Sequence, residues 1–337
     1  MTVHLKDIAA YTGVSIKTVS NVVNGNYARV SPETRMLILE ALEKFNYQPN
    51  MAARHLRKAR VGVIALTIPD LSNPYFSDIG NAITAAAAEY GYTVLLDYTQ
   101  GNREKELQVV KGLRPHLIDG VILDAECLTI EDIQAEQIRE HLVLLGERLF
   151  GAPCDHIVID NEAAAYAATA HLLDIGRKRI AAIGAVEHGH NETPTLRLRG
   201  FTRALREAGQ TFDPALLASG GKWHRADGAA AMRYLLSLAD PPDAVFCFND
   251  LMALGAMSVL HEAGLRIPQD VAVVGFDDIE DGRYATPSLT TIAPDKERIG
   301  RMAVSLLIER IKKTRTQPPE TIYIPFRLCV RNSTRIS

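Results

Sequence analysis

The spacing of apolar residues along the chain changes near residue 60. Up to that point, apolar side chains recur three and four positions apart, which is the interval of one helix face. Beyond it, short uninterrupted apolar runs alternate with helical stretches. The pattern predicts a small helical unit in residues 1–60, followed by a much longer α/β body.

Two short helices are predicted first. Leu5, Ile8 and Ala9 give the first helix a single apolar face, and Gly13 ends it. Ser15 is suited to cap the second helix, because its hydroxyl can accept from a free backbone N–H group of the first turn.

The second helix, residues 16–23, has an inward and an outward side. Val19 and Val22 point inward. The outward side covers an arc of roughly 140° and is the surface that a DNA major groove would meet. It carries Ile16, Lys17, Ser20 and Asn21.

A third helix is predicted from Ser31 as its N-cap and Pro32 as its first residue, and Pro49 is expected to stop it. Its inward positions are Ile38, Ala41, Leu42 and Phe45. Three helices in about 40 residues form a helix-turn-helix unit. The pattern by itself leaves DNA binding and a purely structural helical subdomain both open.

The rest of the chain contains eight apolar runs of strand length. Buried parallel strands have this pattern, and helical stretches such as 163–173 and 251–262 supply the crossovers. We expect two doubly wound α/β subdomains with a cleft between them. The runs are VGVIALTI (61–68), YTVLLDY (92–98), DGVILD (119–124), HLVLLG (141–146), HIVID (156–160), RIAAIG (179–184), AVFCF (244–248) and VAVVGF (271–276).

Charge is unevenly distributed between these parts. The 337 residues carry a net charge of −3, but residues 1–60 hold nine Lys/Arg against four Asp/Glu, or +5, which leaves −8 for residues 61–337. A basic head on an acidic body indicates that only the head meets a polyanion. The four cysteines lie far apart, without metal-ligand spacing, so neither a metal nor a cofactor is expected.

Several classes of protein are disfavoured. No apolar run reaches the ~18 residues of a membrane span, and no export signal is recognisable, so we expect a cytoplasmic protein with no membrane partner. The chain has neither a GxGxxG sequence after the first strand nor a GxxxxGK[ST] sequence. The segment EHGHN, 187–191, could bind a metal, but a polar loop is the favoured interpretation.

The helical head resembles the LacI/GalR family of bacterial transcriptional regulators. The resemblance lies in DIAAYTGVSIKTVSNVVNG and VSPETRMLILEALEKFNYQPNMAARHLR. It implies a DNA-binding headpiece in residues 1–46, a hinge helix or linker in 47–60, and an effector-binding and dimerisation domain in 61–337. The positions that match the headpiece pattern are Asp7, Ile8, Ala9, Gly13, Val14, Ser15, Thr18, Val19, Ser20 and Asn24.

The resemblance also implies which residues read DNA. Ile16 and Asn21 depart from the commonest family pattern, which has a basic residue and an arginine there; Ile16 can offer apolar contact to a thymine methyl, and Asn21 can pair with adenine. Without the resemblance, residues 47–60 would be an ordinary linker. The implied DNA-binding residues are Ser15, Ile16, Lys17, Thr18, Ser20 and Asn21 in the headpiece, and Tyr47, Asn50, Ala53, Arg54 and Leu56 in and around the hinge. There the hinge helix lies in the minor groove with Leu56 wedged between base steps, and Arg54 is suited to nearby phosphates.

The resemblance continues through the body, in IPDLSNPYFSDI, RLRGF, FNDLMALGAM and VAVVGFDDIE. It implies a body similar to periplasmic sugar-binding proteins, which closes on a small effector and has no catalytic function. The implied effector residues are Tyr75, Phe76, Asn191, Thr193, Arg197, Trp223, Asn249 and Asp277.

Structural roles remain as alternatives for several of these residues. Tyr75 and Phe76 could pack at the top of a helix, Arg197 could form a surface ion pair, and Trp223 could fill a core. If Asn249 binds the ligand, the cap of the following helix falls to Asp250. Asp277 and Asp278 are adjacent, so that one of them can be structural.

The identity of the effector is open, with a sugar first and a purine or nucleoside second. Several sugar-responsive relatives have an aspartate at the position of Gly146, and Glu147 is the candidate to replace it. The implied partner is a pseudo-palindromic operator bound by a homodimer. The sequence shows no terminal heptad repeat, so we do not expect a helical tetramer interface. A carbohydrate-binding protein without DNA function and an enzyme acting in the cleft are the alternatives from other classes.

Overall fold

The computed structural model describes residues 3–23, 25–47, 60–112, 117–135, 141–185 and 192–335. Its contacts divide the chain into two compact units, Met1–Val61 and Gly62–Ser337.

The first unit is a bundle of three helices: α1 (Leu5–Thr12), α2 (Ile16–Val23) and α3 (Pro32–Lys44). Its core is small and apolar, as the sequence predicts. The buried residues are Ile8, Ala9, Val19, Val22, Ile38 and Ala41, with Leu42 and Phe45 packed against them.

The predicted helix ends are confirmed at three positions. Gly13 adopts the left-handed conformation, with φ 68°, after α1. The Ser15 hydroxyl accepts from the Thr18 N–H at 3.1 Å, and the Ser31 hydroxyl accepts from the Thr34 N–H at 3.2 Å.

The prediction that Pro49 stops the third helix is wrong for the described part. The helix ends earlier, at Lys44, because Asn46 takes the left-handed conformation with φ 44°. The N–H groups of Asn46 and Tyr47 then reach back to the carbonyls of Glu43 and Leu42, both at 2.9 Å. This pair of hydrogen bonds is a Schellman motif.

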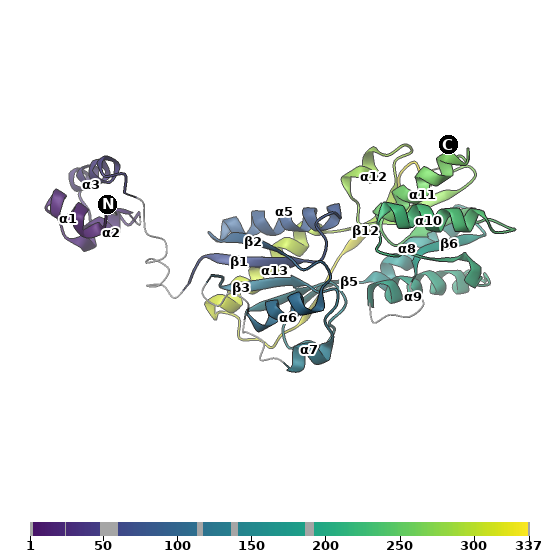
Figure 1. The fold of residues 1–337 in the computed structure, drawn as a ribbon, viewed down its shortest axis with the longest axis horizontal. Helices are drawn as coiled ribbons and strands as arrows, with labels where there is room; N and C mark the ends of the chain where they lie inside the picture. The colour runs from purple at the N-terminus through teal and green to yellow at the C-terminus, as the bar shows by residue number, and fades with distance from the viewer. Residues whose placement is uncertain are drawn as a thin grey trace. The chain divides into compact units, whose positions relative to one another are not determined.

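The second unit contains two six-stranded sheets (Figure 1). All neighbouring strands of the first sheet are parallel, in the order β11-β5-β4-β3-β1-β2. Alternate side chains serve opposite faces: Ile64, Leu66 and Ile68 join one core, and Ala65 joins another with Val109. The strands are β1 (Val63–Ile68), β2 (Thr93–Tyr98), β3 (Gly120–Asp124), β4 (Leu142–Leu145), β5 (Asp155–Ile159) and β11 (Thr321–Ile324); the helices are α5 (Pro74–Glu89), α6 (Arg103–Lys111), α7 (Ile130–Ala135) and α13 (Lys296–Lys312).

The second sheet has the order β12-β10-β9-β8-β6-β7, and only β12 is antiparallel to its neighbour. Its strands are β6 (Ile180–Ala185), β7 (Leu217–Ser219), β8 (Ala244–Cys247), β9 (Ala272–Phe276), β10 (Thr290–Pro294) and β12 (Phe326–Cys329); the helices are α8 (Asn161–Asp174), α9 (Glu192–Glu207), α10 (Arg225–Leu236), α11 (Asp250–Glu262), α12 (Glu280–Tyr284) and the 3-10 turn Pro214–Leu216.

The chain crosses between the two sheets three times in the described structure: after β5, after β10 and after β11. Each sheet with its helices is therefore a subdomain assembled from separate stretches of the sequence. The expected architecture of a helix-turn-helix head and a body of two α/β subdomains is confirmed. All eight apolar runs form strands, whereas β7, β10, β11 and β12 were not among the predicted runs.

Candidate functional site

A cavity of about 720 Å³ lies within the second unit, at the carboxyl ends of strands from both sheets. Residues that follow β1, β3 and β4 line it from the first subdomain, and residues that follow β8 and β9 line it from the second. Open α/β sheets characteristically bind ligands at this edge. The lining includes seven of the eight predicted effector residues, namely Tyr75, Phe76, Thr193, Arg197, Trp223, Asn249 and Asp277; Asn191 lies outside the described residues.

Aromatic side chains form part of the wall. Tyr75 and Phe76 occupy the first turn of α5, which Asn73 caps, and their rings meet edge to face at 5.3 Å. Trp223, in the loop before α10, has φ 64° and packs edge to face against Phe248 at 6.3 Å. The side chains of Tyr75, Phe76 and Trp223 are half-buried and line the cavity, whereas Phe248 is buried behind Trp223.

Arg197 is buried, with 5 % of its surface exposed. Its Nε donates to Asn161 Oδ1 at 2.6 Å, and its Nη1 donates to the Phe248 carbonyl. Burial lowers the pKa of this guanidinium, and the nearby carboxylates of Asp277 and Glu147 oppose that effect. The alternative of a surface ion pair is therefore wrong.

Asp277 and Asp278 have different environments. Asp278 accepts from Arg283 and Arg331, so its role is structural. Asp277 is 6 % exposed, has φ 114°, and receives no hydrogen bond to its carboxylate from any residue of the described chain. Burial raises the pKa of Asp277 to about 7, although Arg197 acts to lower it. A buried carboxylate without a donor is suited to accept from a ligand.

Asn249 has a structural role that the sequence assigned to its neighbour. Its Oδ1 caps α11 by accepting from the Met252 N–H at 2.8 Å, and its Nδ2 donates to the Trp223 carbonyl at 2.8 Å. Asp250 instead accepts from Ile279 and Thr291. The expectation that Asp250 is the cap is wrong, because its side chain turns inward to these donors.

Glu147 of the first subdomain meets Thr193, in the first turn of α9 of the second subdomain, beside the cavity. Thr193 Oγ1 donates to Glu147 Oε2 at 3.0 Å, and the Ile159 N–H donates to Glu147 Oε1 at 2.9 Å. Burial raises the pKa of Glu147, while these hydrogen bonds act in the opposite direction. Glu147 thus places a fixed carboxylate beside the cavity.

Asp124 is a cavity residue that the sequence analysis missed. It ends β3, next to Gly146, which has φ 76°; a Cβ atom at Gly146 would lie 3.1 Å from Asp124 Oδ1. Burial and the carboxylates of Glu147, Glu106 and Glu126 raise the pKa of Asp124 to about 8. The sequence feature that could have identified Asp124 is its position as a polar residue at the end of an apolar run. The other missed polar residues are Asp70, Ser72, Asn73, Tyr98, Gln100, Glu126, Cys127, Arg148, Lys222 and His224.

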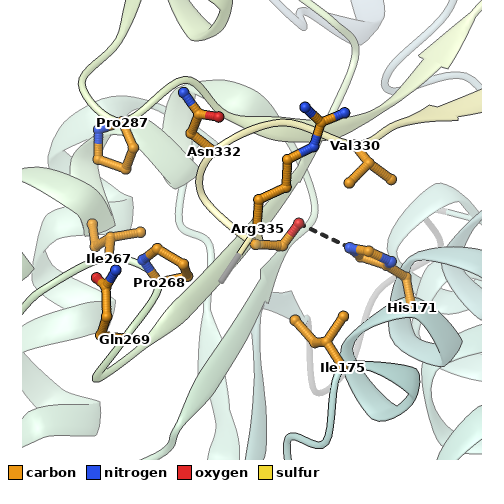
Figure 2. Close-up of a pocket in the computed structure, with 10 residues that line it drawn as sticks. His171, Ile175, Ile267, Pro268, Gln269, Pro287, Val330, Asn332 and Arg335 are labelled. Atoms are coloured by element: carbon orange, nitrogen blue, oxygen red, sulfur yellow. Dashed lines mark hydrogen bonds between the residues drawn. The ribbon is translucent and has the colours of Figure 1, made fainter. Parts of the chain in front are cut away.

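A second, more open cavity of about 770 Å³ lies in the second subdomain, and it contains none of the predicted residues (Figure 2). Ile175, Ile267 and Pro268 make much of its wall apolar. His171 Nε2 lies 2.8 Å from Thr334 Oγ1, so this histidine is engaged by the C-terminal segment. The polar groups that could orient a ligand are concentrated in the first cavity.

The headpiece presents part of the predicted DNA-reading set on its surface. Ile16 is 53 % exposed, and Ser15 and Lys17 are also exposed. Thr18, Ser20, Asn21 and Tyr47 are half-buried. Asn50, Ala53, Arg54 and Leu56 lie outside the described residues, as does the segment 187–191 that was weighed as a metal site.

Metal-ligand clusters and membrane-spanning helices are both absent from the described residues. These residues contain no group of three or more His, Cys, Asp or Glu side chains placed to hold a metal ion. None of their helices is both long and apolar enough to cross a membrane.

Comparison with known families gives two matches. Residues 4–50 match the model described as bacterial regulatory proteins, lacI family, and residues 169–334 match a periplasmic binding protein-like domain. The HTH-type transcriptional repressor PurR of Vibrio vulnificus (strain CMCP6) is 35 % identical over 318 residues, which cover 91 % of this chain and 92 % of the relative.

The solved structures that match nearly the whole chain include two transcriptional regulators. The lac repressor dimer bound to operator and the anti-inducer ONPF is 27 % identical, with a TM-score of 0.84 and coverage of 99 % of each chain. The transcriptional regulator CelR in complex with cellobiose is 30 % identical, with a TM-score of 0.69 and coverage of 98 % of this chain and 99 % of that one.

The lacI-type helix-turn-helix head and the periplasmic binding protein-like body define a DNA-binding transcriptional regulator, not an enzyme. The chain belongs to the LacI family.

Proposed function

We propose that the protein is a repressor whose binding to operator DNA is controlled by a sugar in the first cavity. The observation that carries this proposal is the combination of two buried carboxyl groups, Glu147 and Asp277, with the half-buried aromatic rings of Tyr75 and Trp223 in one cavity. Sugar hydroxyls donate to carboxylates, and the C–H faces of a sugar pack on aromatic rings. The similarity to a cellobiose-binding regulator supports the same ligand class.

A purine is the second candidate, and the names of the PurR relatives favour it. Aromatic rings suit a purine as well as a sugar, and Asp277 could accept from a ring N–H group. We place it second because the cavity offers many acceptors, including Asp70, Asp124 and Glu147, whereas a purine base has few hydrogen-bond donors.

For the DNA contacts, we propose that α2 lies in the major groove and that residues 47–60 act as a hinge in the minor groove. The exposure of Ser15, Ile16 and Lys17 supports the first part. The boundaries 1–46, 47–60 and 61–337 are retained for the headpiece, hinge and effector domain. The full set of proposed contacts adds Thr18, Ser20, Asn21, Tyr47, Asn50, Ala53, Arg54 and Leu56.

We also propose a homodimer on a pseudo-palindromic operator, since a two-fold protein requires two half-sites. The similarity to a lac repressor dimer on its operator supports this assembly. An effector can change operator affinity only if it binds the operator-competent and incompetent states unequally. The three crossings between the subdomains are where their relative orientation can change.

The test combines two titrations. Fluorescence of Trp223, the only tryptophan, is followed during titration with neutral mono- and disaccharides and with purine bases. Operator binding is then measured with and without each compound that gives saturation. A sugar that saturates Trp223 and changes operator affinity supports the proposal; saturation by hypoxanthine or guanine alone makes the purine the effector.

A further inference from the structure

One corner of the first cavity is strongly acidic. It is formed by Asp124 at the end of β3, Glu126 in the loop that follows, and Glu147 after β4; we call it the acidic corner. Behind it, the buried Glu106 of α6 is held by the backbone N–H groups of Glu126, Cys127 and Leu128, at 2.9–3.0 Å. Four carboxyl groups therefore gather where β3 and β4 end.

Within the described residues no cationic side chain forms an ion pair with this corner, although Arg148 acts to lower the pKa of Glu126 and Arg197 that of Glu147. Arg148 is within electrostatic reach of Glu126, but its Nε donates to the Leu128 carbonyl at 2.6 Å. Arg197 is turned towards Asn161 and the Phe248 carbonyl. In the part of the chain that the structure describes, no ion pair or side-chain donor reaches Asp124 or Glu126, and Glu147 is held only by neutral donors.

Asp277 is a second and independent sign of a ligand with positive or hydrogen-bond-donating groups. It lines the same cavity from the other subdomain, is 6 % exposed, and receives no hydrogen bond to its carboxylate within the described residues. Both walls of the cavity thus offer acceptors that the protein leaves unsatisfied. Of these acceptors, Asp277 is buried, Asp124 is half-buried and Glu126 is exposed. Burying the Asp277 carboxyl is costly unless a ligand satisfies it.

We propose that the effector is a sugar carrying a positively charged amino group, that this group binds at the acidic corner, and that ligands carrying phosphate or carboxylate groups are excluded. The inference rests on the proposed sugar-binding function and narrows it. Without a ligand the Asp124 carboxyl is largely protonated at pH 7, because its pKa is raised to about 8. An ammonium group a few ångströms away favours the ionised form of Asp124 and attracts the neighbouring carboxylates, whereas an anion there would be repelled by them. An ammonium group also supplies three donors to acceptors that lack them.

The test uses matched compounds. Glucose, galactose and mannose are each titrated as the neutral sugar, the 2-amino-2-deoxy sugar and the 6-phosphate, and hypoxanthine and guanine are included; Trp223 fluorescence and calorimetry at pH 7 report binding. We expect one amino sugar to bind about tenfold more tightly than its neutral parent, a difference of about 1.4 kcal/mol, and its 6-phosphate to give no saturation.

The outcomes separate this inference from the proposed function. Equal binding of a neutral sugar and its amino derivative keeps the sugar-binding function and overturns the inference. Tighter binding of a sugar 6-phosphate than of its neutral parent also keeps the sugar-binding function and overturns the inference. Saturation by a purine base alone overturns both, as does a panel in which no compound binds.

Variants of the acidic corner localise the effect. Asp124→Asn and Glu126→Gln should each reduce the preference for the amino sugar over its neutral parent several-fold. Glu104→Gln, on the exposed side of α6 and outside the cavity, is the matched control and should retain the preference. An unchanged preference in both corner variants would place the amino group elsewhere and contradict the proposal.

Discussion

The guanidinium carbon of Arg197 lies 3.5 Å from the ring centre of Phe276, the last residue of β9. The ring holds the guanidinium plane from one side, while hydrogen bonds to Asn161 and Phe248 fix two of its nitrogens. Within the described residues Nη2 has no acceptor. A rigid fork with free donors, beside the carboxylate of Asp277, is an arrangement that can bind vicinal hydroxyl groups.

Arg197→Lys should therefore reduce effector affinity at least about tenfold while leaving operator affinity without effector unchanged, because a lysine cannot keep both hydrogen bonds and the stacking contact. Effector titration and operator binding measure the two quantities. Arg199→Lys, at an exposed position of the same helix, is the control. Retained effector affinity in Arg197→Lys would show that the fork does not contact the ligand.

The buried carboxyl of Asp277 should lower the stability of the protein as the pH rises. Burial raises its pKa from 3.8 to about 7, an effect that Asp78 and Glu147 reinforce and that Arg197 and Lys296 oppose. The folded state then binds a proton more tightly than the unfolded state, so its stability falls between about pH 4 and pH 7 and the full penalty remains above that range.

Asp277→Asn should remove this penalty. We expect the variant to be more stable than the wild type at pH 8, by at most about 4 kcal/mol, with the gap closing towards pH 4, and to lose effector binding. Urea unfolding at pH 4.5, 6 and 8 checks the trend. A gap of the same size at every pH would assign the change to packing and not to ionisation.

The two roles of Asn249, capping α11 and donating to Trp223, should be separable by substitution. Asn249→Ala removes both the cap of α11 and the donor to the Trp223 carbonyl, and should cost about 1–2 kcal/mol of stability. Asn249→Ser keeps a capping oxygen but is too short to reach Trp223. It should recover most of the stability while the fluorescence of Trp223 stays altered. If the serine variant is as unstable as the alanine variant, the contact with Trp223 is the larger contribution.

Much of the fold could be predicted from local patterns. Apolar spacing located the three helices of the headpiece and eight strands, and the caps at Ser15 and Ser31 follow from hydrogen bonds made within one turn. β7 has only three residues and β10 begins Thr-Thr, so neither has the long apolar run of a central strand. Strand order could not be predicted, because it depends on pairing between distant segments.

The cavity could be predicted only in part. Seven residues implied by family resemblance do line it, but Asp124 has no motif and becomes visible only when β3 lies beside β4, with Gly146 next to it. The cap of α11 was assigned to Asp250 instead of Asn249 for a similar reason. Ile279 and Thr291, which hold Asp250, come from later segments of the chain.

Operator binding should depend steeply on salt, since residues 1–60 carry a net charge of +5. If Lys17, exposed on α2, contacts a phosphate, Lys17→Ala should weaken binding to all DNA sequences and reduce the slope of log K against log salt by about 1 per head. Lys178→Ala, at an exposed position of the body, should leave the slope unchanged. A flat salt dependence of the wild type would contradict the DNA-binding role of the basic head.

The glycine at position 146 should be required for two physically different reasons. Its φ of 76° strains any L residue by about 1 kcal/mol, and a Cβ atom would lie 3.1 Å from Asp124 Oδ1. Gly151 has a similar φ of 83°, but a Cβ atom added there would meet nothing within 4 Å, so Gly151→Ala reports the backbone strain alone. We expect Gly146→Ala to be the less stable of the two variants and the only one with weakened effector binding.

A double-mutant cycle isolates the contact between Gly146 and Asp124. Asp124→Ser shortens the side chain, so the extra destabilisation of Gly146→Ala over Gly151→Ala should largely disappear in the Asp124→Ser background, whereas the cost of Gly151→Ala should be the same in both backgrounds. Urea unfolding of the six proteins gives the coupling free energy. Simple additivity at position 146 would mean that Asp124 moves aside freely, and that the position of its carboxylate is not fixed by the neighbouring strand.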